Sequence, residues 1–125
     1  MDQRKNILII EDDGGMIELL SFILRRGGFN PLCAFGGREG LRVAQETPVD
    51  LILLDLMMED MNGWMVLEVL RADDRLCSIP VIIISARHRL EDPAQTAIHA
   101  DQFEGYLVKP FLVRDLLSQI QEALA

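Results

Sequence analysis

The sequence is short of cysteine and has no long apolar segment. Its 125 residues include two cysteines, Cys33 and Cys77, without a CxxC spacing, and a chain of this length needs no disulfide to hold its core. The longest apolar runs, such as 7–10 and 51–54, are far shorter than the roughly 20 residues of a membrane span. Residues 1–6 also lack the apolar stretch of a signal peptide. These absences predict reduced cysteines, no membrane contact and a cytoplasmic location.

Basic residues are also scarce. Lys and Arg number 12 against 20 Asp and Glu, and the net charge of −8 would repel a nucleic-acid backbone and an anionic lipid surface alike. We therefore expect no direct nucleic-acid binding by this chain. Half of the residues are hydrophobic and 26% are charged, which is an ordinary globular composition. Without an internal repeat or a linker, residues 1–125 are predicted to form one domain.

Short apolar segments rich in branched residues alternate with longer segments of helical spacing. The short segments are strand candidates, and they lie at residues 7–10, 31–35, 51–54, 81–84 and 106–108. The i, i+3, i+4, i+7 spacing of an amphipathic helix occurs twice, as Met16, Leu19, Leu20 and Ile23 and as Val113, Leu116, Leu117 and Ile120. Such alternation predicts an α/β fold with a parallel sheet and helices on both of its faces.

Turn and cap signals mark the remaining helices. Gly27-Gly28 would end the first helix, and Asn62-Gly63 would open the third. A second helix is expected around residues 38–45. Asp92-Pro93 would supply the N-cap and the first residue of a fourth helix.

Reactive side chains follow four of the five predicted strands. They are Glu11, Asp12 and Asp13 after the first strand, Asp55 after the third, Ser85 after the fourth and Lys109 after the fifth. In an open parallel sheet, ligands bind where the loops leave the carboxyl ends of the strands. Carboxylates gathered there need a cation to stay ionised, and Mg²⁺ suits carboxylates together with a phosphate oxygen. A carboxylate such as Asp55 can act as a nucleophile toward phosphorus, with Lys109 and Ser85 neutralising or binding the phosphoryl oxygens.

Four motifs in this order resemble the receiver domains of two-component response regulators, over essentially the whole chain. The motifs are ILIIEDD at 7–13, DLILLD at 50–55 with MNG at 61–63, VIIISA at 81–86, and YLVKPF at 106–111. The resemblance implies a three-layer, flavodoxin-like (βα)5 fold. Its doubly wound parallel sheet would have the strand order 2-1-3-4-5.

The resemblance also implies roles for individual residues. Asp55 would accept a phosphoryl group from a sensor histidine kinase or a histidine phosphotransfer protein. Asp12 would bind Mg²⁺ directly and Glu11 directly or through water, together with Asp55, and the backbone carbonyl of Met57 would complete the protein ligands. Ser85 and Lys109 would contact the phosphoryl oxygens.

The family further implies a switch. Ser85 would move toward the phosphoryl group while Tyr106 turns inward, and the surface around the fourth helix, fifth strand and fifth helix would change its affinity for a downstream output domain or target protein.

The Lys109-Pro110 bond is expected to be cis. Such a chain is a phosphoprotein and not an enzyme beyond its own phosphorylation and dephosphorylation. Dimerisation on phosphorylation, and whether the domain stands alone, are left open by the residues.

Three departures from the family pattern stand out. Glu59 occupies a position where receivers often have proline, which predicts a less constrained loop after Asp55. Gly14-Gly15 predicts fraying at the start of the first helix. The stretch from Ser85 to Lys109 is about two residues longer than expected and lacks the common Gly-Ala-Asp, so the fourth helix is expected to be shifted or irregular.

Plainer interpretations exist for several of these residues. Asp13 is expected to be structural or exposed, and Tyr106 could be an ordinary half-buried strand aromatic. His88 and His99 have no ligand spacing and are interpreted as surface or loop residues. Arg87, just past Ser85, is interpreted equally well as a tuning residue or as an ordinary loop residue.

Three other functions compete with the receiver hypothesis. A magnesium-dependent phosphatase would also use an aspartyl nucleophile after a strand, but a second acid commonly stands two residues on, where this chain has Met57. A nucleotide-binding fold would need a glycine-rich phosphate loop after the first strand, which the sequence lacks. The third alternative is a receiver-like interaction module with little or no phosphorylation.

Overall fold

The protein forms a five-stranded parallel sheet with the strand order β2-β1-β3-β4-β5. The computed structural model describes residues 3–87 and 91–125. The strands are β1 (Asn6–Glu11), β2 (Asn30–Phe35), β3 (Leu51–Asp55), β4 (Val81–Ser85) and β5 (Gly105–Val108). Each strand coincides with a predicted apolar segment to within a residue at either end. The predicted fold class and strand order are therefore confirmed.

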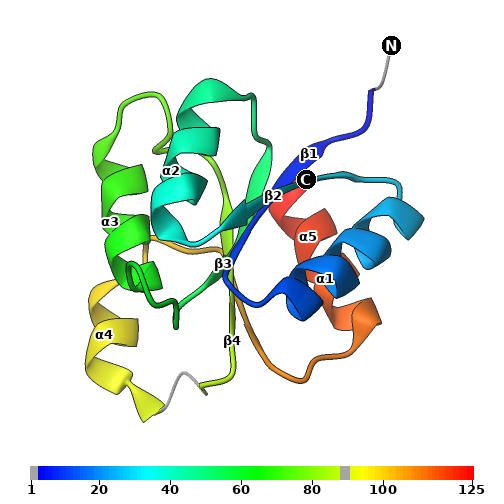
Figure 1. Ribbon diagram of the computed structural model, residues 1–125. Coiled ribbons are helices and arrows are strands. Elements are labelled where there is room, and N and C mark those ends of the chain that lie inside the picture. Colours follow the sequence, from blue (N-terminus) through cyan, green and yellow to red (C-terminus); the bar gives the residue numbers. More distant parts are fainter. Residues whose placement is uncertain (1–2, 88–90) are drawn as a thin grey trace.

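Helices cover both faces of this sheet (Figure 1). They are α1 (Gly14–Arg26), α2 (Gly37–Glu46), α3 (Gly63–Ala72), α4 (Pro93–Ile98) and α5 (Val113–Leu124). Helices α1 and α5 lie on one side, and α2, α3 and α4 lie on the other. None of the helices in the described ranges is both long and apolar enough to cross a membrane.

Alternate side chains of the central strands build two cores, one on each face of the sheet. Leu8 and Leu54 pack into the core beneath α2 and α3, whereas Ile7 and Leu53 pack into the core beneath α1 and α5. Strands β3 and β4 are buried along their whole length because both of their faces are covered. This explains why their sequences are continuously apolar up to the residues that end them, Asp55 and Ser85.

Two residues of the predicted apolar stripes lie outside the core. Leu19 on α1 and Val113 on α5 are each 48% exposed, so the expectation that they pack inward is wrong. Phe22, one turn after Leu19, is 60% exposed and borders a surface cavity of about 460 Å³ that Val113 also lines. The other stripe residues are buried or half-buried. The α1–α5 side of the molecule therefore presents large apolar side chains to solvent.

Capping bonds fix the helix starts next to the sheet edge. The Asp13 side chain accepts hydrogen bonds from the N–H groups of Gly15 and Met16, so α1 begins at Gly14 in spite of its two glycines. Asn62 caps α3 in the same way by accepting from the Met65 N–H at 3.0 Å. The short helix α4 begins at Pro93 as predicted, but the Asp92 side chain makes no capping bond. With six residues, α4 is the shortest helix in the described part of the chain.

Glycine substitutions provide a test of this arrangement. A Cβ atom on Gly63 would lie 2.5 Å from the Asp55 carbonyl oxygen and 2.7 Å from Leu56 Cα, whereas one on Gly14 would meet nothing within 4 Å. We expect Gly63→Ala to lower the free energy of unfolding by about 1–3 kcal/mol. Gly14→Ala should raise it by about 0.4–1 kcal/mol. Urea denaturation of both variants checks this, and equal effects would contradict the close packing at Gly63.

Candidate functional site

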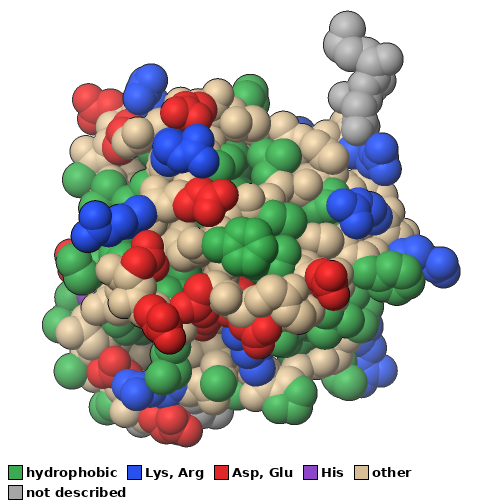
Figure 2. All heavy atoms as spheres, viewed as in Figure 1, with side chains coloured by type: hydrophobic (Ala, Val, Ile, Leu, Met, Phe, Trp, Pro, Cys, Tyr) green, Lys and Arg blue, Asp and Glu red, His purple; other side chains and the backbone are tan. Residues whose placement is uncertain are grey.

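The parallel register brings the polar strand ends to one edge of the sheet. Asp55 pairs with Ile84, the residue before Ser85, and Ser85 pairs with Val108, the residue before Lys109. Likewise, Ile10 pairs with Leu54, so Glu11 and Asp55 end neighbouring strands. Acidic side chains gather over the area where β1 and β3 end, low in the view of Figure 2. Residues that are up to 98 positions apart in the sequence thus form one site.

Three carboxylates lie within reach of a single cation. Oxygen atoms of Glu11, Asp12 and Asp55 all lie within 4.8 Å of one another. Glu11 and Asp55 are buried, with 2% and 5% exposure, and Asp12 is exposed. Mg²⁺ prefers oxygen ligands and commonly keeps several waters, so two buried acids and one open acid fit its needs. The structure therefore assembles the carboxylates that the sequence suggested as metal ligands.

Lys109 supplies the positive charge on the protein side of the site. Its Nζ atom lies 2.8 Å from Glu11 Oε2 and 3.8 Å from Asp55 Oδ2. The lysine backbone is tied to the fourth strand, because the Lys109 N–H donates to the Ser85 carbonyl at 2.8 Å. The Lys109-Pro110 bond is cis, as the family resemblance implied.

Asp55 is held in an environment that opposes its ionisation. Burial, then the hydrogen bond and the charge of Glu11, raise the pKa of Asp55 from 3.8 to about 7. Lys109 and the Met57 N–H, which donates to Asp55 Oδ1 at 3.2 Å, act in the opposite direction. A single lysine is therefore too little positive charge for two buried carboxylates, which is the physical reason to expect a divalent cation here.

The remaining predicted residues lie around this centre. Ser85 is fully buried, and its Oγ atom accepts a hydrogen bond from the Arg87 N–H at 3.1 Å. Tyr106 is half-buried, and its hydroxyl donates to the Arg87 carbonyl at 2.6 Å, while its ring packs edge-on against Phe103. The Met57 side chain is 54% exposed. The switch role of Tyr106 and the metal contact of the Met57 carbonyl stay predictions.

The loop between β3 and α3 is tied down at points that the sequence did not reveal. The Glu59 N–H donates to Asp12 Oδ2 at 3.0 Å, a bond that proline at this position could not make. Asp60 accepts from the N–H groups of Gly37 and Arg38, both at 3.0 Å, and so caps α2 from outside that helix. These bonds, that of Arg38 first, lower the pKa of Asp60. The Glu59 N–H and the Asp60 side chain thus tie this loop to Asp12 and to the start of α2, where the family often has a proline ring.

Sequence reasoning missed or misjudged several of these residues. No residue of α2 caps its own N-terminus, where Gly36 has a φ of 104°. The sequence offered one signal for Asp60: the start of α2 has no side-chain cap of its own, so its first N–H groups need an acceptor from another part of the chain. The expectation of a surface position for His99 is wrong, since it is 2% exposed. His88 lies outside the described residues.

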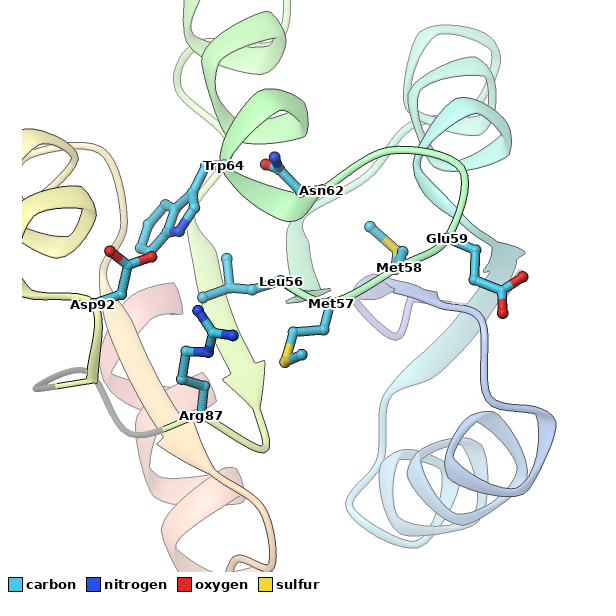
Figure 3. Close-up of a pocket in the computed structure, with 8 residues that line it drawn as sticks. All are labelled: Leu56, Met57, Met58, Glu59, Asn62, Trp64, Arg87 and Asp92. Atoms are coloured by element: carbon cyan, nitrogen blue, oxygen red, sulfur yellow. The ribbon is translucent and has the colours of Figure 1, made fainter.

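A cavity of about 430 Å³ opens beside the loop that follows Asp55 (Figure 3). It is lined by Leu56, Met57, Met58, Glu59, Asn62, Trp64, Arg87 and Asp92. The guanidinium of Arg87 points into the space between Leu56, Trp64 and Asp92, whereas the Glu59 carboxylate points away from it. Trp64, the single tryptophan of the chain, is thus placed to report on events at this loop.

Comparison with known proteins identifies the family. Residues 7–121 match the response regulator receiver domain. The chain is 32% identical over 122 residues to the DNA-binding response regulator MtrA of Mycolicibacterium paratuberculosis. This match covers 97% of this chain and 52% of MtrA. The chain is also 35% identical over 118 residues to the DNA-binding dual master transcriptional regulator RpaA of Synechocystis sp. That match covers 94% of this chain and 48% of RpaA.

Solved structures agree with this assignment. A CheY-like response regulator receiver domain protein from Methanospirillum hungatei JF-1 has a TM-score of 0.86 and 28% identity, with 98% of this chain and 94% of that chain covered. The chain belongs to the response regulator receiver domain family. It spans about half the length of the curated relatives described above.

The raised pKa of Asp55 predicts a pH-dependent gain in stability when its charge is removed. The folded-state pKa of about 7 exceeds the ordinary value of 3.8, so native stability falls as the pH rises through this window. Without metal, the free energy of unfolding of Asp55→Asn, measured by urea denaturation, should therefore exceed that of the wild type by up to about 4 kcal/mol at pH 8. Near pH 4 the two values should differ little. Mg²⁺ should stabilise the wild type more than the variant. A gap that is constant with pH would contradict the buried-charge account.

The Glu59 N–H predicts a difference between two variants at one position. Glu59→Ala removes the carboxylate and keeps the N–H that orients Asp12, whereas Glu59→Pro removes both. We expect Glu59→Pro to bind Mg²⁺ about threefold to tenfold more weakly than Glu59→Ala, the size of one hydrogen bond. Mg²⁺ titrations followed by Trp64 fluorescence or calorimetry measure this. Equal affinities would show that the N–H does not orient Asp12 for a metal.

Proposed function

We propose that this chain is a phosphoacceptor receiver domain, in which Asp55 takes a phosphoryl group from a sensor histidine kinase or a histidine phosphotransfer protein. The observation that carries the proposal is the buried Asp55 carboxylate, 3.8 Å from Lys109 Nζ and clustered with Glu11 and Asp12. Membership of the receiver family supports the same chemistry. Acting only on its own phosphorylation and dephosphorylation, the chain would not be an enzyme in the wider sense.

The proposed transfer needs an ionised Asp55. One carboxylate oxygen attacks phosphorus, the bond from phosphorus to the donor's histidine nitrogen breaks, and the nitrogen leaves with the electron pair. Lys109 lies where its ammonium can neutralise the oxygens of the transferred group, while the buried hydroxyl of Ser85 can donate to one of them. Because burial and Glu11 favour the neutral acid, added positive charge near Asp55 increases its reactive fraction.

Mg²⁺ is the metal that we propose for this site, bound by Glu11, Asp12 and Asp55 with the carbonyl of Met57. When bound, it would supply charge neutralisation for the carboxylates and for the phosphoryl oxygens. The burial of Glu11 and Asp55 against one lysine supports this choice, since water cannot screen these charges. Asp12, exposed and oriented by the Glu59 N–H, would complete the site from the solvent side.

Partner binding is proposed to follow from the phosphorylated state. Ser85 and Tyr106 both bond to Arg87, through its N–H and its carbonyl, so a movement of Ser85 toward the phosphoryl group would disturb the Tyr106 bond. Tyr106 lies on β5 and lines a surface cavity with residues of α5, and we place the surface for an output domain or target protein around α4, β5 and α5. The relatives that are twice as long include DNA-binding regulators, whereas the net charge of −8 argues against nucleic-acid binding by this domain itself.

The α1–α5 side is the surface that we propose for the phosphodonor protein. Leu19, Phe22 and Val113 are exposed there, and α1 begins directly after the acidic residues of the site. Contiguous exposed apolar side chains commonly mark protein contacts. A donor seated on this side would approach the sheet edge that holds Asp55.

Phosphorylation by a small-molecule donor tests the function without the unidentified kinase. With acetyl phosphate and Mg²⁺, intact-mass spectrometry should show one added phosphoryl group on the wild type and none on Asp55→Asn. Lys109→Ala should label at least about tenfold more slowly because it removes the ammonium beside Asp55. Unchanged labelling of Asp55→Asn would overturn the acceptor assignment. No labelling of the folded wild type would favour an interaction module that signals by binding alone.

A further inference from the structure

His99 is buried at the end of α4 with an acceptor oxygen at each of its ring nitrogens. Its Nδ1 atom lies 2.8 Å from the Gln95 carbonyl oxygen, and its Nε2 atom lies 3.0 Å from Glu68 Oε1. The side chain is 2% exposed, so water does not reach the ring freely. A backbone carbonyl accepts hydrogen bonds and does not donate them, and the same holds for a carboxylate while it is ionised.

This geometry is satisfied by one protonation state of the imidazole. A neutral ring has one N–H and one lone pair, so each tautomer turns a lone pair toward either the Gln95 carbonyl or the Glu68 carboxylate. The imidazolium has two N–H groups and donates to both oxygens. Its positive charge is also paired with the ionised Glu68 at 3.0 Å.

The contacts of His99 join the helices α3 and α4. Glu68 belongs to α3, Gln95 belongs to α4, and no side chain within the six residues of α4 is buried. The imidazole stacks on the indole of Trp64 from α3, with ring centres 4.7 Å apart and planes 18° apart. A helix this short gains little from its own hydrogen bonds, so its position depends on such anchors.

We infer that His99 and Glu68 form a protonation-dependent clasp, which holds the C-terminal end of α4 on α3 and loosens when His99 loses a proton. Trp64 carries the effect toward the proposed phosphorylation site. It extends from α3 toward α4 and also lines the cavity beside the acceptor loop, together with Met57 and Arg87 (Figure 3). The clasp thus makes the placement of α4 sensitive to pH, independently of any phosphoryl group.

The charged groups around His99 define the direction of the effect. From α3, Glu68 contacts the ring, while Arg71 is engaged by the Gln102 carbonyl at 2.9 Å and by Glu104. Beyond α4, the chain carries the exposed Asp101. Stabilisation is present while His99 is protonated and Glu68 is ionised, and it is lost as the pH rises and the ring becomes neutral. It also weakens in acid, when Glu68 gains a proton.

Trp64 fluorescence tests the clasp, because a protonated imidazole stacked on an indole quenches its emission more than a neutral one. The titration uses the Asp55→Asn background, since Asp55 has a pKa of about 7 and would change charge in the same range. Emission should rise in one step as the pH is raised and the His99 ring loses its proton. The step should persist in His88→Asn and be absent in His99→Asn.

Two substitutions of Glu68 separate the clasp from simple packing. Glu68→Gln retains an acceptor and adds an amide N–H that can donate to a neutral ring, so the stack should persist with a pH step reduced at least about twofold. Glu68→Ala removes the partner, and its emission in mild acid should resemble that of the wild type in mild alkali. A wild-type pH step in both variants would overturn the inference.

NMR of the His99 ring nitrogens tests the clasp in the wild type, so it does not depend on whether a variant folds. Long-range ¹H–¹⁵N spectra of the folded wild type, recorded at the pH where Trp64 emission is most strongly quenched, should show two protonated nitrogens for His99. One protonated and one bare nitrogen, in the folded protein at that pH, would overturn the clasp outright.

Discussion

Two buried carboxylates beside one lysine are the constraint on which the rest of this structure depends. Glu11 and Asp55 end neighbouring strands and have almost no exposure, and Lys109 contacts both from the end of a third strand. The raised pKa of Asp55 records the imbalance. A site of this kind is stable when a proton, a cation or a change in charge at Asp55 relieves the repulsion, and those are the states between which a phosphorylation switch must move.

Backbone hydrogen bonds of the β3–α3 loop organise the exposed side of this site. The loop donates from Glu59 to Asp12, and through Asp60 it accepts from the start of α2. Asn62 then starts α3, so three separate stretches of the chain, at Asp12, at the start of α2 and at the start of α3, are fixed from one loop. Asp12, two helix starts and Asp55 are therefore connected through one loop, although the loop itself lies at the surface.

The opposite flank of the site is held by fewer and more easily changed contacts. Arg87 links Ser85 to Tyr106 through its backbone, and the short α4 rests on α3 through His99 and Trp64. Such polar contacts shift with the charge or protonation of one group, unlike the apolar packing that fixes α1 and α5. Helix α4, none of whose own side chains is buried, thus depends on a few polar and aromatic contacts, whereas α1 and α5 pack into a core.

The sequence by itself determined the fold and the members of the acidic site. Continuous apolar strands, interrupted by helical spacing, specify a covered parallel sheet, and in a parallel sheet the residue after each strand must arrive at the same edge. The motifs around Asp55 and Lys109 are local in the chain, so they can be read directly. Tertiary structure alone decided the exposure of Leu19 and Val113, the capping of α2 by Asp60 and the burial of His99 against Trp64. Each of these depends on which element packs against a residue from a distant part of the chain, and no local spacing or propensity encodes that choice.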